Sequence, residues 1–472
     1  MDWKGEHPFM YLAERTVLTE KVHVQEFALA DRNARLAKQL YNAALFRMRQ
    51  VFTGWEKTVR TDNEKEVFGE LAVLQREFPG LKAGRVLSYR ALEKLMRATG
   101  NPDFFAGLPM QTAQSVVKAA VTDFRAWLAA LKAYRKVPSK FCGKPQMPRY
   151  CKKERKSFTI TNQDAVLYPV YTKTGDGTVY AGMELKLPGI RHRLFLPHLP
   201  EEAVLKEVKV CPYYRKYVLI LVLEVGESVK QADMPHMAGI DFGTDNIAAI
   251  VTTDHASRVY KGGAVLAENR LFHKEKAKAV RILTKGTRHR HASSRHLDFL
   301  SRKHDGFMRD ALHKISADIV RFCIKHRVGT IVIGTNPFWK QNTGLGTASN
   351  QNFVSVPHAL LRWMITYKAH AAGIAVILQE ESYTSKADVT ASDYMPVYGD
   401  KEASDAVFSG KRVKRGLYRC GDGCTINADC NGAANILRKA FPHAWEQTDS
   451  FRFLSRPESV SFRTLNRCRN AV

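Results

Sequence analysis

Two aspartates lie in stretches of the chain where a charged side chain needs a special partner. Asp241 ends the apolar run HMAGID, and Asp429 stands among small residues in INADCNGAANIL. An unpaired buried charge is costly, whereas divalent cations such as Mg²⁺ prefer carboxylate oxygens as ligands. Two such cations, about 4 Å apart, catalyse phosphodiester cleavage. The sequence therefore predicts that both aspartates belong to one metal-binding set whose members are far apart in the chain.

Each aspartate could also have a simpler role. Asp241 could form a turn before Gly243, and Asp429 could be the N-terminal cap of the helix that follows, because aspartate favours that position. The small residues 432–434 would let this helix pack closely on a sheet, and Asn435 could hydrogen-bond to nearby backbone. The apolar strand before Asp241 favours a metal-binding role there, whereas for Asp429 both roles stay open.

A third ligand is expected from a neighbouring strand. The apolar run TIVIGTN has Gly334 near its end, which offers no ligating side chain, and the next run, AVILQEES, ends in Glu380 and Glu381. The longer glutamate side chain could reach inward from this outer strand. Because side chains alternate along a strand, the two glutamates point to opposite faces. We favour Glu381 as the ligand and keep Glu380 as the alternative.

The elements that must position these acids alternate between strands and helices. Apolar runs predict strands in HMAGID, NIAAIVTT, TIVIGTN and AVILQEES, and helical periodicity predicts helices at about 306–326, in PHALLRWMITYKAHAAG and at 428–440. This order indicates an α/β domain at 236–440 and matches the ribonuclease H fold. The stretch 386–427 is rich in loop residues. The polar segment 441–472, with five arginines, is expected to be a flexible basic tail.

The first half of the chain predicts a β domain with a helical insertion. An alternating pattern suggests a strand at 16–25, and the clearest later strands are VLKEVKV and YVLILVLEV. Between them, apolar stripes predict helices at 27–52 and 111–134. We therefore expect a small barrel or sheet formed by 1–25 and 136–235, with a helical domain at 26–135 inserted between its two parts.

Charge favours a nucleic-acid partner. The chain has 73 Lys and Arg against 46 Asp and Glu, a formal charge of +27. Such an excess repels itself unless an anion neutralises it. Nucleic acid fits better than an anionic membrane, because no amphipathic basic helix or lipidation signal is present. No apolar run spans a bilayer and no signal pattern opens the chain, so a cytoplasmic protein with reduced cysteines is expected.

Two segments concentrate the positive charge. Residues 136–156 contain eight Lys and Arg and one acid, with Phe141 and Tyr150 interleaved, and residues 270–303 contain eleven Lys and Arg and two acids. In 136–156, cations alternate with aromatic residues in an extended loop, a pattern that suits a phosphate backbone with stacked bases. A solvated linker is the alternative for 136–156.

Six blocks of the second half resemble a known family. They are GIDFGTDN, TIVIGTNPFWKQ, PHALLRWMITYKAHAAGI, EESYTSK, GKRVKRGLYR and INADCNGAANIL, in the right order over 236–440. Together they resemble the RuvC-like half of TnpB proteins, which are transposon-encoded, RNA-guided DNA endonucleases related to compact type V CRISPR effectors. The resemblance implies an α/β RNase H-like (RuvC) nuclease domain. The first half agrees in plan with that family's β-barrel (wedge) domain and its helical recognition insertion.

The resemblance also implies roles for residues. Asp241, Asp429 and a glutamate, Glu381 or Glu380, would be the catalytic acids, and two Mg²⁺ ions, or Mn²⁺, would be held by Asp241, Glu381 and Asp429. The family's usual glutamate corresponds to Gly334, and some relatives carry the glutamate pair before SYTSK instead. This departure suggests a rearranged site. The partners would be a guide RNA and target double-stranded DNA, with no membrane, and the protein would be a monomer or a homodimer.

A second departure concerns zinc. Many relatives form a zinc ribbon from two Cys-x2-Cys pairs, whereas the first pair is replaced here by TSKADVTASD, and Cys420 and Cys424 are spaced by three residues. Four local ligands are missing, so zinc is not expected. The degenerate insertion at 386–427 would fold on hydrogen bonds instead. Four cations of this insertion, Lys386, Lys411, Arg412 and Arg415, are candidates for nucleic-acid contact, as is Lys340 upstream of it. Each could equally be an ordinary surface charge.

Two other functions compete with a guided nuclease. The missing acid at Gly334 suggests a cleavage-deficient, RNA-guided DNA-binding protein that acts as a transcriptional repressor. The retention of Asp241 and Asp429 argues against it, because an inactive site has no need of costly acids. The second competitor is a nuclease or transposase of the same fold that works without RNA.

Overall fold

A computed structural model describes the chain in eight stretches: residues 10–175, 177–226, 234–286, 293–336, 356–391, 393–397, 406–446 and 448–467. The chain forms two compact units, Met1–Glu227 and Ser228–Val472, and each is described by itself. Lys340, one of the candidate nucleic-acid contacts, lies outside the described residues.

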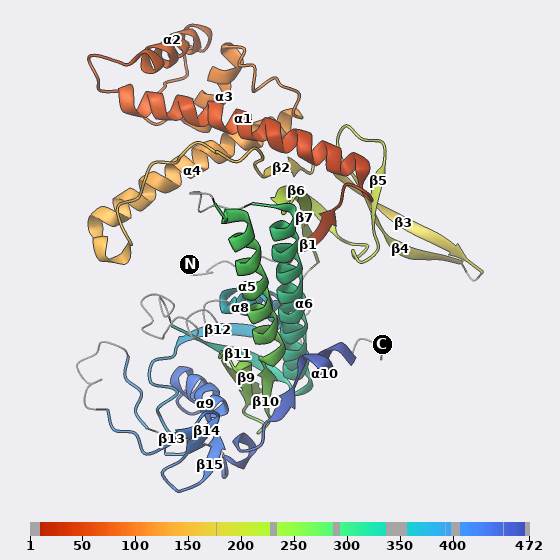
Figure 1. The fold of residues 1–472 in the computed structure, drawn as a ribbon, viewed down its shortest axis with the longest axis vertical. Helices are drawn as coiled ribbons and strands as arrows, with labels where there is room; N and C mark the ends of the chain where they lie inside the picture. The colour runs from red at the N-terminus through yellow and green to blue at the C-terminus, as the bar shows by residue number, and fades with distance from the viewer. Residues whose placement is uncertain are drawn as a thin grey trace. The chain divides into compact units, whose positions relative to one another are not determined.

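The first unit contains two sheets and a group of helices (Figure 1). One sheet has the strand order β1-β7-β6-β2 and the other the order β3-β4-β5. The strands are β1 (Met10–Leu18), β2 (Phe158–Thr161), β3 (Val166–Thr174), β4 (Gly177–Lys186), β5 (Arg193–Leu196), β6 (Val204–Tyr213) and β7 (Lys216–Val225). β1 pairs with β7 along its whole length. β1, which precedes the helices in the sequence, therefore belongs to the same sheet as three strands that follow them.

Four helices separate β1 from β2 in the sequence: α1 (Val24–Gly54), α2 (Asp62–Glu77), α3 (Tyr89–Ala98) and α4 (Met110–Lys136). The helices predicted at 27–52 and 111–134 correspond to α1 and α4. The predicted strand at 16–25 is β1, which begins earlier and ends at Leu18. Sequence analysis did not predict α2, although Thr61 and Glu64 form a capping box at its start.

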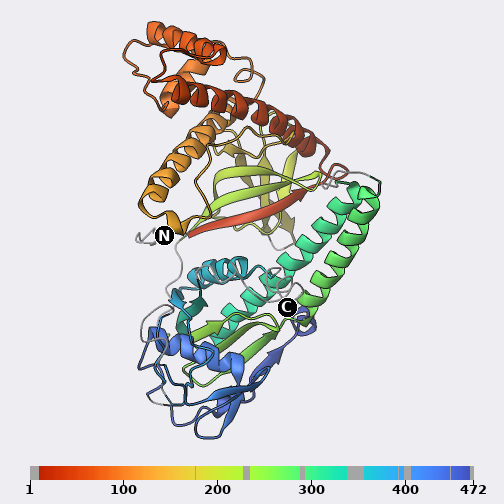
Figure 2. The ribbon, with the colours of Figure 1, turned by 60° about the vertical axis from the view of Figure 1, so that its left-hand side comes forward.

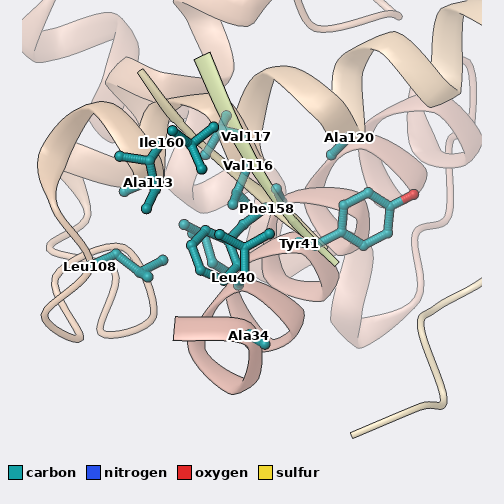
Figure 3. Close-up of a cluster of buried hydrophobic side chains, with 14 of the residues drawn as sticks. Ala34, Leu40, Tyr41, Leu108, Ala113, Val116, Val117, Ala120, Phe158 and Ile160 are labelled. Carbon is teal, nitrogen blue, oxygen red and sulfur yellow. The ribbon is translucent and has the colours of Figure 1, made fainter. Parts of the chain in front are cut away.

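The core of this unit lies where α1, α4 and β2 meet (Figure 3). Leu40 of α1, Val117 of α4 and Ile160 of β2 are fully buried there. Tyr41 donates a 2.6 Å hydrogen bond to Asp123, which satisfies its hydroxyl at the edge of the cluster. The apolar stripes of the two long helices are therefore packing surfaces, as expected.

The second unit is built on one mixed six-stranded sheet with the order β12-β11-β8-β9-β10-β16. Its strands are β8 (His236–Asp241), β9 (Asn246–Thr252), β10 (Ser257–Lys261), β11 (Val328–Thr335), β12 (Ala375–Glu380) and β16 (Glu458–Val460). β8, β9 and β10 are antiparallel neighbours, whereas β11 runs parallel to β8 and β12 parallel to β11. This strand order matches the ribonuclease H fold that the element order predicts.

Helices cover both faces of this sheet (Figure 2). They are α5 (Gly263–Thr284), α6 (Arg295–Lys325), α8 (His358–Ala371) and α9 (Ala428–Ala440). Alternation along β11 sends Ile331 and Ile333 into one core with α6 and α8, and sends Val332 into another with α9. A Cβ on Gly239 would lie 2.2 Å from the carbonyl oxygen of Ala433, so only glycine lets α9 pack this closely on β8.

The described part of the basic stretch 270–303 contains the end of α5 and the start of α6, helical segments that the sequence patterns did not assign. The segment after Phe441 was expected to be a flexible tail, but its described part is packed: β16 joins the sheet beside β10, Leu454 is fully buried, and Arg258 pairs with Glu458 at 2.6 Å. Burial of apolar side chains outweighs the polar composition of the segment.

The stretch 386–427 contains a small three-stranded sheet, with the order β13-β14-β15. Its strands are β13 (Lys411–Lys414), β14 (Leu417–Arg419) and β15 (Thr425–Asn427), which leads directly into α9. Among the described residues, no helix is long and apolar enough to cross a membrane.

Candidate active site

Asp241 is the last residue of β8, at the end of a strand next to the centre of the sheet. A Cβ on Gly432 of α9 would lie 2.8 Å from Oδ2 of Asp241, so the helix backbone passes directly over this carboxylate. Burial, together with the nearby carboxylates of Glu381 and Asp429, raises the pKa of Asp241 well above its ordinary value. Three acids thus repel one another at one end of the sheet.

Asp429 lies in the first turn of α9, but it is not the cap. Asn427 is the N-terminal cap, and its side chain accepts hydrogen bonds from the backbone N–H groups of Asp429 and Cys430 at 3.0 and 3.1 Å. A capping role for Asp429 is therefore wrong. Its carboxylate is free to accept other donors, and it accepts a 2.6 Å bond from Asn246 and a 3.3 Å bond from Arg412.

Glu381 follows directly after β12 and reaches across to β11. A Cβ on Gly334 would lie 2.5 Å from Oε2 of Glu381, so the carboxylate occupies the space that a side chain at position 334 would fill. β11 and β8 are parallel, and Ile333 is opposite Ile240. Gly334 follows Ile333 and Asp241 follows Ile240, so positions 334 and 241 are neighbours on the two strands. Glu381 therefore supplies an acid at the position beside Asp241 where β11 offers none.

The pKa values of the two glutamates shift in opposite directions. Burial, with the neighbouring charge of Glu380, raises the pKa of Glu381 to about 7, and Arg362 opposes this shift. The pKa of Glu380 is lowered despite its burial, because Lys439 and Ser382 hydrogen-bond to its carboxylate. The ion pair from Lys439 Nζ to Glu380 Oε2 is 2.6 Å long. Which glutamate ligates a metal stays a prediction, and this geometry favours Glu381.

The three acids line one pocket of about 1310 Å³. Of the candidate cations, Lys386, Arg412 and Arg415 also line it. Arg415 pairs with Asp245, and Lys386 is exposed with its ammonium 5.5 Å from the ring of Tyr383. Lys411 is exposed on β13 and does not line the pocket.

Sequence analysis did not predict three further polar residues of this pocket: Asn246, Lys261 and Arg270. Asn246 is buried, and its amide holds one oxygen of Asp429. Its position at the start of β9, five residues after Asp241, is the signal that could have identified it. Lys261 and Arg270 carry no comparable signal. Lys261 is a single cation at the end of a strand, and Arg270 is one of the eleven Lys and Arg of 270–303.

The donor chemistry of the pocket suits hard divalent cations. Asp241, Glu381 and Asp429 offer only carboxylate oxygens. Burial, and then the charges of the other two acids, raise the pKa of Asp241, and a cation would relieve the repulsion between the carboxylates. In the described part of the chain, no three acidic, histidine or cysteine side chains are close enough to form a ready-made metal site. In this structure Asn246 and Arg412 hold Asp429 instead.

Asparagines of α9 fasten the loop that follows Glu381. Asn435 donates to the carbonyl oxygens of Thr384 and Ala387 at 2.9 and 2.7 Å, which confirms the predicted backbone contacts. Asn431 donates to Ala387 as well and accepts from the N–H of Val389. Because these amides are buried, they fix residues 384–389 against the helix that carries Asp429.

Carboxylates hold the described part of the insertion together. Asp388 is fully buried and accepts hydrogen bonds from the N–H groups of Thr390 and Gly421 at 2.9 and 2.7 Å. Asp393 accepts from the N–H groups of Asp388 and Ser409 at 2.8 and 2.9 Å. Cys430 is buried in the core between α9 and the sheet. The described part of the insertion thus contains the hydrogen-bond framework that the sequence predicts.

Comparison with known proteins agrees with this architecture. A family model for OrfB_IS605, described as a probable transposase, matches residues 220–338, and a model for the Cas12f1-like TNB domain matches residues 358–436. The TnpB-like protein ORF457 of Acidianus two-tailed virus is 28% identical over 319 residues, which cover 62% of this chain and 64% of that protein. These matches support a TnpB-family, Cas12f-related protein. The chain spans 64% of the length of its viral relative.

Solved structures of Cas12 proteins are more distant. A Cas12f1–sgRNA–target DNA complex shares 15% identity, covering 89% of this chain and 86% of that one with a TM-score of 0.45. A binary complex of AacC2c1 with sgRNA shares 12% identity, covering 83% and 65% with a TM-score of 0.34.

Proposed function

We propose that this protein is an RNA-guided, metal-dependent DNA endonuclease that cleaves target DNA at the pocket formed by Asp241, Glu381 and Asp429. The observation that carries the proposal is the place of the Glu381 carboxylate, in the space of a side chain at position 334. This placement supports a rearranged acidic site over a lost one. The matches to TnpB-family and Cas12f1-like proteins and the charge of +27 support nucleic acid as the ligand.

Asp241, Glu381 and Asp429 would hold two Mg²⁺ ions, with Mn²⁺ as a substitute. When bound, these ions would activate water and stabilise the leaving oxygen. The elements of the chain would position the acids: Asp241 ends its strand, Asp429 is in the capped first turn of α9, and Glu381 precedes the loop that Asn435 binds.

Basic residues around the pocket would bind the phosphate backbone. Arg412 is half-exposed and donates one 3.3 Å bond to Asp429, so a phosphate oxygen can take another of its donors. Lys386 and Arg415 line the same pocket with exposed side chains. The first turn after Asp241 is held by His358, whose ring stacks on Phe242 and lies 3.0 Å from the carbonyl oxygen of Gly243. These contacts keep the pocket wall in place while a strand is bound.

A guide RNA would supply sequence recognition by base pairing, and the protein would read a short flanking motif and the shape of the duplex. The exposed cations of 136–156 and of α5 and α6 are the candidates for backbone contacts. The guided DNA-binding repressor remains the second candidate, because β11 carries glycine in place of an acid.

Co-purified RNA and a cleavage assay test the proposal together. RNA that remains with the purified protein is sequenced, and a DNA target matching its variable part is incubated with the complex and Mg²⁺. We expect cleavage by the wild type, and binding without cleavage by D241N. A wild type that binds its target without cutting would establish the repressor, and cleavage that persists after RNA removal would establish a nuclease that works without a guide.

A further inference from the structure

Lys439 is a largely buried lysine near the active site that the proposed mechanism does not use. Its side chain is 10% exposed, and lysine is rarely buried unless its charge is paired. Nζ donates to Oε2 of Glu380 at 2.6 Å and to the carbonyl oxygens of Ser382 and Pro396 at 3.0 and 3.2 Å. Three acceptors match the three donors of an ammonium group, so its hydrogen-bonding capacity is filled.

Glu380 is fixed by these contacts on both of its oxygens. Oε2 accepts from Lys439, and Oε1 accepts from the backbone N–H of Ser382 at 2.7 Å. Two consecutive glutamates at a strand end could exchange places, because each could reach a metal if the backbone rotated. Glu380 precedes Glu381 and Ser382 follows it. The hydrogen bonds that Glu380 accepts from Lys439 and from Ser382 oppose that rotation.

The neighbouring residue Glu381 has a different environment. Its carboxylate lies over Gly334 and lines the pocket with Asp241 and Asp429, whereas Glu380 is absent from that lining. Lys439 also belongs to α9, the helix that carries Asp429 in its first turn. One helix therefore presents an acid to the pocket at its start and anchors the competing glutamate near its end.

We propose that Lys439 is a positioning residue that assigns separate roles to the two glutamates. It neutralises and anchors Glu380, so that Glu381 alone faces the pocket as a ligand for a divalent cation. This inference rests on the proposed function of the site. Without Lys439, Glu380 would carry an uncompensated charge beside Glu381, and the strand end would lose its anchor to α9.

Mn²⁺ binding to the purified full-length protein tests the inference without requiring cleavage. Isothermal titration with Mn²⁺ alone is compared for the wild type, K439M, K439R, E380Q and K439M/E380Q. We expect K439M to weaken binding about 10- to 100-fold, the usual loss when a residue that orients a metal ligand is removed. K439R should restore most of the affinity, because it keeps the charge. E380Q should bind nearly as the wild type does.

The double variant separates positioning from a general structural role. Removing the charge of Glu380 removes the need for a counter-ion, so K439M/E380Q should bind Mn²⁺ more tightly than K439M. If K439M and K439M/E380Q bind Mn²⁺ equally weakly and have equal thermal midpoints, the inference is overturned. If K439M fails to fold, E380Q carries the test, because a loss of Mn²⁺ affinity as large as that of E381Q would make Glu380 a ligand.

Mn²⁺ binding and DNA cleavage by E381Q and D241N test the proposed function separately. If E381Q and D241N bind Mn²⁺ and cleave DNA as the wild type does, the acidic site itself is wrong. If those variants lose both activities while K439M keeps them, the site stands and the role of Lys439 is refuted.

Discussion

The carboxylate of Glu381 lies over the α-carbon of Gly334, with Oε2 only 2.5 Å from where a Cβ would be. On the other side, the same Cβ would lie 2.5 Å from Cδ1 of Ile436 in α9. The absence of a side chain at 334 is thus what allows an acid from β12 to reach the pocket. The glycine and the displaced glutamate are two parts of one arrangement.

Replacing Gly334 by alanine should therefore disturb both stability and cleavage. The added methyl group must displace Glu381 or Ile436, and overpacking of this kind costs about 1–3 kcal/mol. We expect G334A to lower the urea midpoint and to slow cleavage by more than it weakens target binding. Gly306 in α6 is the matched control, because a Cβ there meets nothing within 4 Å. G306A should leave both measurements unchanged or slightly raise the urea midpoint.

The same relationship predicts a rescue. E381A removes the acid and should abolish cleavage, whereas G334E/E381A places a new carboxylate on β11 in the space that Glu381 has vacated. We expect the double variant to recover measurable cleavage, and G334E alone to remain impaired, because two side chains then compete for one space. A double variant as inactive as E381A, although folded and able to bind its target, would show that position 334 cannot serve the site.

The sequence predicts those parts of the site that depend on local pattern. Asp241 can be located because an apolar strand precedes it, and four of the six strands in this sheet, β8, β9, β11 and β12, are recognisable as apolar runs. The pairing of Glu380 with Lys439 joins residues 59 positions apart. A basic residue in the final turn of a helix is common, because it interacts favourably with the helix dipole, so Lys439 does not stand out in the sequence. Likewise, β16 is three residues long, and only its contact with β10 distinguishes it from a loop.

Stability without metal should depend on pH through Glu381. Burial raises its pKa from 4.5 to about 7, so the folded protein binds more protons than the unfolded chain between these pH values. The contribution of Glu381 to stability is therefore fully present below pH 4.5 and is lost as the pH rises through 7. E381Q cannot titrate, so the wild type should lose stability relative to E381Q over this window. Urea midpoints in EDTA at several pH values measure the difference, and two parallel pH profiles would contradict the prediction.

Arg412 should matter for cleavage more than for folding. Its side chain is 48% exposed and its pair with Asp429 is 3.3 Å long, so the pair adds little stability. If the guanidinium binds phosphate at the pocket, R412A should slow cleavage by about 10²-fold, the usual cost of losing a donor to the reacting group. Lys411 is the control, because it is exposed on the same strand and does not line the pocket. Equal rates for R412A and K411A would refute a role at the reacting phosphate.

The insertion should keep its structure when metals are removed, because carboxylates hold it. Asp388 is fully buried and satisfies two backbone N–H groups, those of Thr390 and Gly421, and also the hydroxyl of Thr390. D388A leaves these donors without their acceptor, at about 1–3 kcal/mol for each one that stays buried. We expect hydrogen exchange in β13–β15 to accelerate in D388A and to be unchanged by EDTA in the wild type. Asp422 is exposed and accepts a local 2.9 Å bond from the N–H of Cys424, so D422A provides the control. Acceleration by EDTA in the wild type would mean that a bound metal, and not the Asp388 network, holds the small sheet together.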